Sequence, residues 1–182
     1  MLQNIAVFLI SALFSLYIGA VLVRFLLAYA RADFHNPYSQ ALVKVTNPVL
    51  VPLRRFIPAI GKVDTSSLVL AFILKLIGGV LITGILGKGL DLTYLLPAAV
   101  VDVVRSLIWI YMVAMIVQAV MSWLGDTHGN PIASLLHSLT APILRPIRKV
   151  VPMLGMIDLS PLVAILALQV CLMVLVPLPG VF

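Results

Sequence analysis

The sequence predicts an all-α membrane protein with four transmembrane helices in two parallel tandem repeats, each with an amphipathic segment between its two spans. The first observation is composition, since 63% of the 182 residues are hydrophobic and 10% are charged, against about 25% charged in an average soluble domain. The second is a repeat, because Asn36-Pro37 recurs 94 residues later as Asn130-Pro131. The same spacing relates Pro52, Pro58, Gly61 and Asp64 to Pro146, Pro152, Gly155 and Asp158. It indicates two copies of one supersecondary unit, over residues 1–88 and 89–182.

The spans are expected in the longest apolar stretches, because about 20 apolar residues are needed to cross the hydrocarbon core. These stretches are residues 5–29, 65–86, 97–123 and 161–176. The first is expected to be a retained helix, since a cleaved signal has a basic start and a shorter apolar run. The third is expected to begin near Pro97, with proline in its first turn.

Lysine and arginine positions predict the orientation of the spans, because short cytoplasmic loops carry an excess of these residues. The connection between spans one and two contains Arg31, Lys44, Arg54, Arg55 and Lys62, and that between spans three and four contains Arg145, Arg148 and Lys149. The opposite side has only Lys88 and Arg105. Both basic connections are therefore expected in the cytoplasm and both termini outside. Since each repeat has an even number of spans, the two copies insert in the same orientation.

Both basic connections have helical periodicity in their apolar residues. The first places Leu42, Val45, Val49, Leu53 and Phe56 at steps of three and four, and the second places Leu136, Leu139, Ile143, Ile147 and Val150 at equivalent positions. Asn36 and Asn130 are expected to cap these helices, each followed by proline at the first helical position. The internal prolines are expected to break each segment into short helical pieces.

Such segments fit best in the membrane interface, with their apolar side toward the lipid. Their basic residues would then contact anionic headgroups or a protein partner, and the residues expected in that role are Arg54, Arg55, Arg145, Arg148 and Lys149. The alternative is a pair of ordinary cytoplasmic helices packed on the bundle.

These connections also carry a family resemblance. The stretches DFHNPYSQALVKVTNPVLVPLRRFIPAIG (33–61) and NPIASLLHSLTAPILRPIRKVVPMLG (130–155), each followed by an aspartate and an apolar helix, resemble the paired repeats of the YggT family, which is related to YlmG. The resemblance implies a bacterial inner-membrane protein. Members are associated with tolerance of osmotic shock, and relatives with cell division, plastid nucleoid distribution and maturation of a membrane cytochrome.

The resemblance favours a non-enzymatic factor that organises or assembles membrane components. The alternative is a small oligomeric channel or transporter for ions or osmolytes. Expected partners are anionic lipids, other membrane proteins and further copies of the chain. Small residues at four-residue spacing would allow close helix contacts, namely Ser11, Ser15 and Gly19 in the first span and Gly79, Thr83 and Gly87 in the second.

Four polar side chains fall within the predicted spans as repeat-related pairs, Arg24 with Gln118 and Lys75 with Gln169. Lys75 lies near the midplane, where an ionised lysine costs about 3 kcal/mol on insertion scales. It is expected to face the bundle interior and bond to Gln169 or Gln118. The alternatives are a permeation or ligand site and snorkelling along a tilted helix. Arg24 lies nearer the cytoplasmic end, where it is expected to snorkel.

The remaining charged residues suggest structural roles. Asp64 and Asp158 precede the second and fourth spans, as N-caps do, although they could also be read as a catalytic carboxylate pair. Asp102 and Arg105 are three residues apart and are expected to form an ion pair on one helix.

No catalytic, cofactor-binding or metal-binding residues are predicted. Asp33-x-His35 and Asp126-x-His128 could together hold a divalent metal, but an additional glycine in the second copy shifts its register. The single cysteine, Cys171, excludes an intrachain disulfide. The pI of about 9.8 points to anionic lipid rather than nucleic acid, since the basic residues lie beside the spans.

Overall fold

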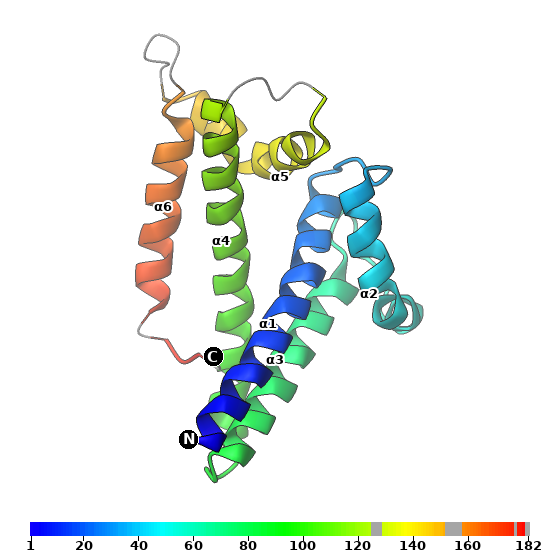
Figure 1. Cartoon of the computed structure of the whole chain (residues 1–182), viewed down its shortest axis with the longest axis vertical. Helices are drawn as coiled ribbons and strands as arrows, with labels where there is room; N and C mark the ends of the chain where they lie inside the picture. Colours follow the sequence, from blue (N-terminus) through cyan, green and yellow to red (C-terminus); the bar gives the residue numbers. More distant parts are fainter. Residues whose placement is uncertain (125–128, 152–157, 177, 181–182) are drawn as a thin grey trace.

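The computed structural model describes residues 1–124, 129–151, 158–176 and 178–180, which form six α-helices in two equivalent sets of three (Figure 1). The first set is α1 (Leu2–Tyr29), α2 (Pro37–Phe56) and α3 (Thr65–Ile85). The second set is α4 (Leu92–Leu124), α5 (Pro131–Arg148) and α6 (Ser160–Leu175). The prediction of an all-α fold is confirmed for the described residues.

Three of these helices, α1, α3 and α4, are long and apolar enough to cross a membrane. The chain is therefore a membrane protein. The helix expected in the fourth apolar stretch is present as α6, but it has 16 residues. At 1.5 Å per residue α6 is about 24 Å long, shorter than the hydrocarbon core of about 30 Å.

The start of α4 differs from its prediction. The helix begins at Leu92, so Pro97 lies inside it rather than in its first turn. The carboxylate of Asp91 accepts the backbone N–H of Thr93 at 3.0 Å and that of Tyr94 at 3.4 Å. These bonds satisfy orphan donors of the first turn, which lets the helix start before the proline.

The amphipathic segments also differ from their prediction. They are not broken into short pieces, because α2 continues through Pro48 and Pro52, and α5 continues through Pro142 and Pro146. A proline inside a helix removes one hydrogen bond and bends the axis. Figure 1 shows α2 changing direction along its length, which is the expected effect of a kink.

The six helices pack mainly within their own sets, α1 against α3 and α4 against α6. The sets join through α3 and α4, with smaller contacts of α1 with α4 and of α2 with α5. An apolar cluster of Ile18, Leu22, Ala71 and Val103 lies at this junction. In Figure 1, α1 and α4 run in the same direction, and α2 and α5 both lie toward the end where α1 and α4 finish. The amphipathic helices therefore occupy the same end of the bundle.

Candidate functional site

Each amphipathic helix is held by a hydrogen bond to a polar side chain of the preceding span. Arg24 Nη1 donates to Thr46 Oγ1 at 2.6 Å, and the two residues are 5% and 0% exposed. In the second repeat Thr140 Oγ1 donates to Gln118 Oε1 at 2.6 Å. The expectation that Arg24 snorkels is wrong, because its side chain is buried and donates to Thr46 inside the protein.

An ion pair joins the end of each amphipathic helix to the start of the following helix, α3 or α6. Arg54 Nη2 donates to Asp64 Oδ2, which also accepts the hydroxyl of Ser67 at 2.8 Å. Arg148 Nε donates to Asp158 Oδ2 at 2.9 Å. The two pairs occupy equivalent positions, so both α2 and α5 are fixed to the bundle at two points. We call these four interactions the anchors.

The two aspartates differ as helix caps. Asp158 accepts the backbone N–H of Ser160 at 2.9 Å and so caps α6 from one position earlier than the N-cap residue Leu159. The side chain of Asp64 is at the N-cap position of α3 but makes no capping bond. The capping prediction is therefore wrong for Asp64, whose carboxylate is oriented instead by Arg54 and by the hydroxyl of Ser67.

These interactions lower the pKa of both carboxyl groups. Burial of the Asp64 carboxyl raises its pKa, but the hydrogen bonds from Arg54 and Ser67 and the charge of Arg54 outweigh burial and hold the pKa below its ordinary value of 3.8. The pKa of Asp158 is lowered by the same balance, with burial opposed by bonds from Ser160 and Arg148.

We expect acidification to remove the contribution of the Asp64 pair to stability. A carboxyl group with a depressed folded-state pKa contributes stability that is fully present above its unfolded value, 3.8, and is lost as the pH falls through the folded value. Asp64→Asn should therefore be less stable than wild type at neutral pH, and the two should converge at low pH. Thermal unfolding in detergent across this range measures the difference. Asp158→Asn is the matched control and should show a smaller difference, since the Asp158 side chain is 27% exposed and that of Asp64 is 10% exposed. A constant difference between wild type and Asp64→Asn would contradict the role of this ion pair.

The remaining basic residues of the prediction lie on the surface. Arg55, Arg145 and Lys149 are exposed, and they form no ion pair among the described residues. Large exposed apolar side chains accompany them near the same helices. We define the interfacial surface as Val45, Val49, Arg55, Phe56, Arg145, Lys149 and Val150. Apolar side chains beside arginine and lysine are typical of helices that lie in a membrane interface.

The predicted apolar stripe packs on the bundle to different extents in the two repeats. Val45 and Val49 are exposed on α2, whereas the residue equivalent to Val45, Leu139, is buried on α5. Two positions outside this stripe are buried in both repeats, Leu50 with Leu144 and Thr46 with Thr140. Each helix therefore packs one edge against the bundle, and α2 leaves more of its stripe exposed.

Lys75 lies at the centre of α3 and is 4% exposed, so it faces the protein interior as predicted. The negative charge near it belongs to Asp102 of α4, which also accepts Arg105 Nη1 at 3.0 Å. The expected contact of Lys75 with Gln169 is wrong, because α6 packs on α4 and α5 and does not contact α3. The other expected partner, Gln118, is bonded to α5. The expected ion pair of Asp102 with Arg105 is confirmed.

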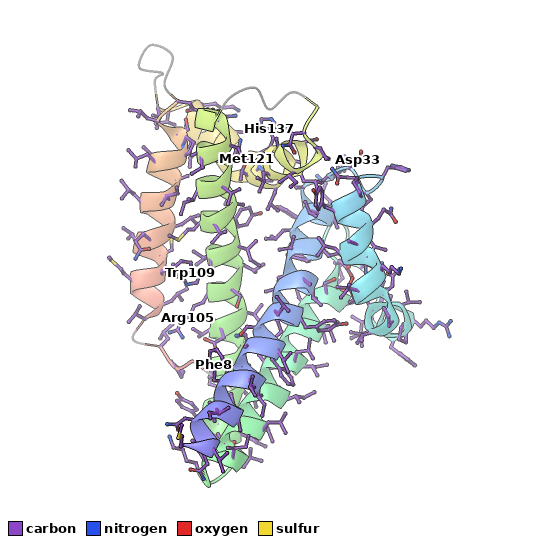
Figure 2. All side chains as sticks on the ribbon, viewed as in Figure 1. Phe8, Asp33, Arg105, Trp109, Met121 and His137 are labelled. Atoms are coloured by element: carbon purple, nitrogen blue, oxygen red, sulfur yellow. The ribbon has the colours of Figure 1, made fainter. Side chains whose placement is uncertain are left out.

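Arg105 has a second role that the sequence did not indicate. Its Nη2 donates to the backbone carbonyl of Leu175 and, at 2.8 Å, to that of Leu178, so it satisfies carbonyl groups at the end of α6. Figure 2 shows Arg105 on α4 beside this end of α6. The chain packs closely there, since a Cβ at Gly180 would lie 2.3 Å from Arg105 Nη1.

A pocket of about 880 Å³ lies between the two repeats at the end of the bundle where α5 crosses. Figure 2 shows Asp33, Met121 and His137 around it. The other polar lining groups are His35, Asn36, Gln118, Ser122, Asn130, Ser134 and Ser138. Asn36 Nδ2 donates to the carbonyl of Pro131 at 2.7 Å and thereby joins the two repeats. The pocket can offer hydrogen bonds to a small polar molecule.

The predicted caps of the amphipathic helices are confirmed at this pocket. The side-chain oxygen of Asn36 accepts the N–H of Tyr38 at 3.0 Å, and that of Asn130 accepts the N–H of Ile132 at 2.9 Å. Asp126 and His128 of the metal-site alternative lie outside the described residues. Within the described residues no group of three or more histidine, cysteine or acidic side chains could hold a metal ion.

Sequence reasoning missed Thr46, Thr140 and the bond from Asn36 to the second repeat. A signal for the threonines was present, because they are 94 residues apart and are polar positions shared by the two amphipathic segments. No sequence signal indicated the bond from Asn36, since this bond has no equivalent in the other repeat among the described residues.

Known proteins resemble this chain over nearly its whole length. The CCB3/YggT family matches residues 3–85 and again 97–179. An uncharacterized protein of Pseudomonas aeruginosa, PA0392, is 39% identical over 170 residues, which cover 92% of this chain and 86% of that protein. The uncharacterized protein YggT of Escherichia coli is 36% identical over 168 residues, covering 92% and 87%. An uncharacterized protein from the proC 3' region of Vibrio alginolyticus is 38% identical over 173 residues, which cover 92% of this chain and 91% of that protein.

No solved structure matches the chain significantly. The two family matches coincide with the two sets of three helices, and the chain belongs to the CCB3/YggT family.

Proposed function

We propose that this chain is a non-enzymatic protein of the bacterial inner membrane that organises or assembles membrane components through its two amphipathic helices. The observation that carries the proposal is the set of anchors. In each repeat a hydrogen bond and an ion pair hold the amphipathic helix against the neighbouring helices, and the hydrogen bond is buried in the first repeat and partly buried in the second. A passive connection between two spans has no need of a fixed orientation, whereas a docking face does.

The proposed topology has four spans, with α2 and α5 on the cytoplasmic side and both termini outside. The shortest span in this topology is α6. A span that ends inside the hydrocarbon region would leave its last backbone carbonyl groups without hydrogen-bond donors. Arg105 supplies donors to those carbonyls, which supports a short fourth span. The residues of the two basic connections then face the anionic cytoplasmic leaflet.

Reporter fusions test this topology. We expect alkaline phosphatase to be inactive when fused after Lys62, because the enzyme needs export to become active, and active when fused after Gly89. A fusion at each site to a reporter that functions only in the cytoplasm serves as the control and should give the reverse pattern. Activity of alkaline phosphatase after Lys62 would refute the orientation.

We propose that the docking face formed by the two amphipathic helices binds anionic lipid through the basic members of the interfacial surface. Arg55, Arg145 and Lys149 can each contribute up to about 1 kcal/mol of attraction to an anionic leaflet, less salt screening. Replacing these three residues by glutamine should lower the preference for phosphatidylglycerol over phosphatidylcholine, measured by native mass spectrometry or by co-purified lipid. The loss should be largest at low ionic strength.

A matched variant separates lipid binding from folding. Arg54→Gln with Arg148→Gln removes two basic residues that the structure assigns to ion pairs with Asp64 and Asp158. We expect this variant to lose stability with a smaller change in lipid preference. Equal lipid preference in wild type and in the variant lacking Arg55, Arg145 and Lys149 would remove the support for a lipid-docking face.

A role in osmotic tolerance or in cell division, as the family resemblance implies, is compatible with a protein that arranges membrane components. We propose no direct contact with nucleic acid, since the basic residues lie near the ends of the spans.

The second candidate function is a small oligomeric channel or transporter for ions or osmolytes. The observation in its favour is the pair of buried charged residues between α3 and α4, Lys75 and Asp102, with the partly exposed Arg105 beside Asp102. Apolar packing by Ile18 and Leu22 at the junction of the repeats favours a closed single chain. Ion flux into liposomes that contain the purified protein separates the two functions, because an organising factor should leave flux at the level of protein-free liposomes. Flux that Lys75→Met alters would favour the channel.

A further inference from the structure

The two repeats are joined by the contact of α3 with α4, and the structure has no second contact of this kind among the described residues. In a closed arrangement of two equivalent repeats, the contact of α3 with α4 would be matched by a contact of α6 with α1. The structure has the first contact, but α6 contacts neither α1 nor α3 among the described residues. Figure 1 shows α6 on the far side of α4 from α1. Each half of the internal interface therefore has an equivalent surface elsewhere that this chain does not cover.

The α4 half of the interface has its equivalent on α1. Val103, Leu107 and Ile110 of α4 pack in the apolar clusters at the junction with α1 and α3. The residues 94 positions earlier are Leu9, Leu13 and Leu16. They are also large and apolar, and they are 53%, 66% and 77% exposed.

The α3 half of the interface has its equivalent on α6. Leu68 and Phe72 of α3 pack in the same apolar cluster as Val103. Their equivalents on α6 are Leu162 and Leu166, which are 55% and 58% exposed. Both surfaces of a potential second interface thus have the apolar character of the internal one.

The charged residues differ between the internal interface and its equivalent. Lys75 and Asp102 correspond to Gln169 on α6 and Phe8 on α1. If α4 packed instead on the α6 of another copy, Asp102 would face the uncharged Gln169, and the buried Lys75 of α3 would be separated from this carboxylate. Burying a charge without an opposite charge is unfavourable, so the charged pair directs α4 to its own α3. Phe8 is uncharged and needs no opposite charge. The surface of α1 can therefore pack on α6 of another copy.

We propose that a second copy of this chain covers these surfaces, with α1 of one copy packing on α6 of the next as α4 packs on α3 within the chain. The contact is heterologous, because the two surfaces are different. The parallel orientation of the repeats, proposed above, lets successive copies share one membrane plane. Repetition of the contact then produces a closed ring or an open row in that plane. The inference is independent of whether the amphipathic helices bind lipid.

Cysteine cross-linking between two differently tagged chains tests this contact. Both chains carry Cys171→Ser, since Cys171 is the only native cysteine. One chain carries Phe8→Cys and the other Gln169→Cys, the positions equivalent to Asp102 and Lys75. Oxidation of membranes that contain both chains should give a disulfide-linked mixed dimer, and membranes with either chain alone should give none. A second pair, Leu16→Cys with Leu162→Cys, should behave in the same way.

The other results each overturn the proposal. No mixed dimer with either pair means that lipid covers these surfaces. A dimer formed by Phe8→Cys chains alone means that α1 pairs with α1 of another copy. As a control, Trp109→Cys takes the place of Gln169→Cys in the partner chain. Trp109 is at an exposed position of α4, and this chain should give no mixed dimer with Phe8→Cys. A mixed dimer in this control would show that the cross-linking is not specific. Since all substituted positions except Gln169 are exposed, the variants should retain the fold.

Discussion

Replacing Asp102 by alanine is expected to lower the free energy of unfolding by about 3–5 kcal/mol, the range measured when one partner of a buried ion pair is removed. Asp102 is 3% exposed and is the carboxylate that opposes both Lys75 and Arg105. Without it, the buried Lys75 loses the carboxylate that opposes its charge, and Arg105 loses its ion-pair partner. The same change weakens the orientation of Arg105 and thereby the end of α6.

Thermal unfolding and resistance to denaturing detergent measure this loss. Asp33→Ala is the control, because Asp33 is exposed. Lys75→Met alone should be tolerated, since it removes a costly buried charge and leaves Asp102 paired with Arg105. Combined with Asp102→Ala, it should recover part of the lost stability. A double variant no more stable than Asp102→Ala would show that Lys75 and Asp102 do not depend on each other.

The second large effect is expected at the anchor between α1 and α2. Thr46→Val keeps the shape of the side chain and removes the acceptor of Arg24 Nη1. A hydrogen bond to a charged group contributes about 1.5–3 kcal/mol, and a neutral one about 0.5–1.5 kcal/mol. Thr46→Val should therefore cost more than Thr140→Val, which removes the neutral bond to Gln118 in the second repeat.

The two threonine variants are each other's control, because they delete the same hydroxyl at equivalent positions of one chain. Their unfolding in detergent should be compared at one pH. Arg24→Met in the Thr46→Val background should then restore stability, since no buried charge remains without an acceptor. Equal losses in the two variants, or no recovery with Arg24→Met, would mean that Thr46 acts through packing and not through Arg24.

The sequence by itself determined the membrane class, the repeat and most helix positions. Apolar length and composition depend on local residues, so α1, α3 and α6 lie where their stretches predicted. The caps at Asn36 and Asn130 followed from side chains that bond to backbone two positions away. Local rules failed where two of them competed. Pro97 lies inside α4 because Asp91 starts the helix earlier, and the prolines of α2 and α5 bend those helices without ending them.

Only the tertiary structure decided which polar groups meet. The repeat related Lys75 to Gln169, but their helices lie on different sides of α4, so Lys75 is opposed by Asp102 instead. The anchors depend likewise on how far each amphipathic helix folds back on its span, and Arg24 meets a threonine 22 residues away. Internal symmetry of a sequence specifies which residues are equivalent, whereas the partner of a buried charge depends on how the repeats pack. Burying a charge without a partner costs several kcal/mol, and the packing that supplies the partner is a property of the whole bundle.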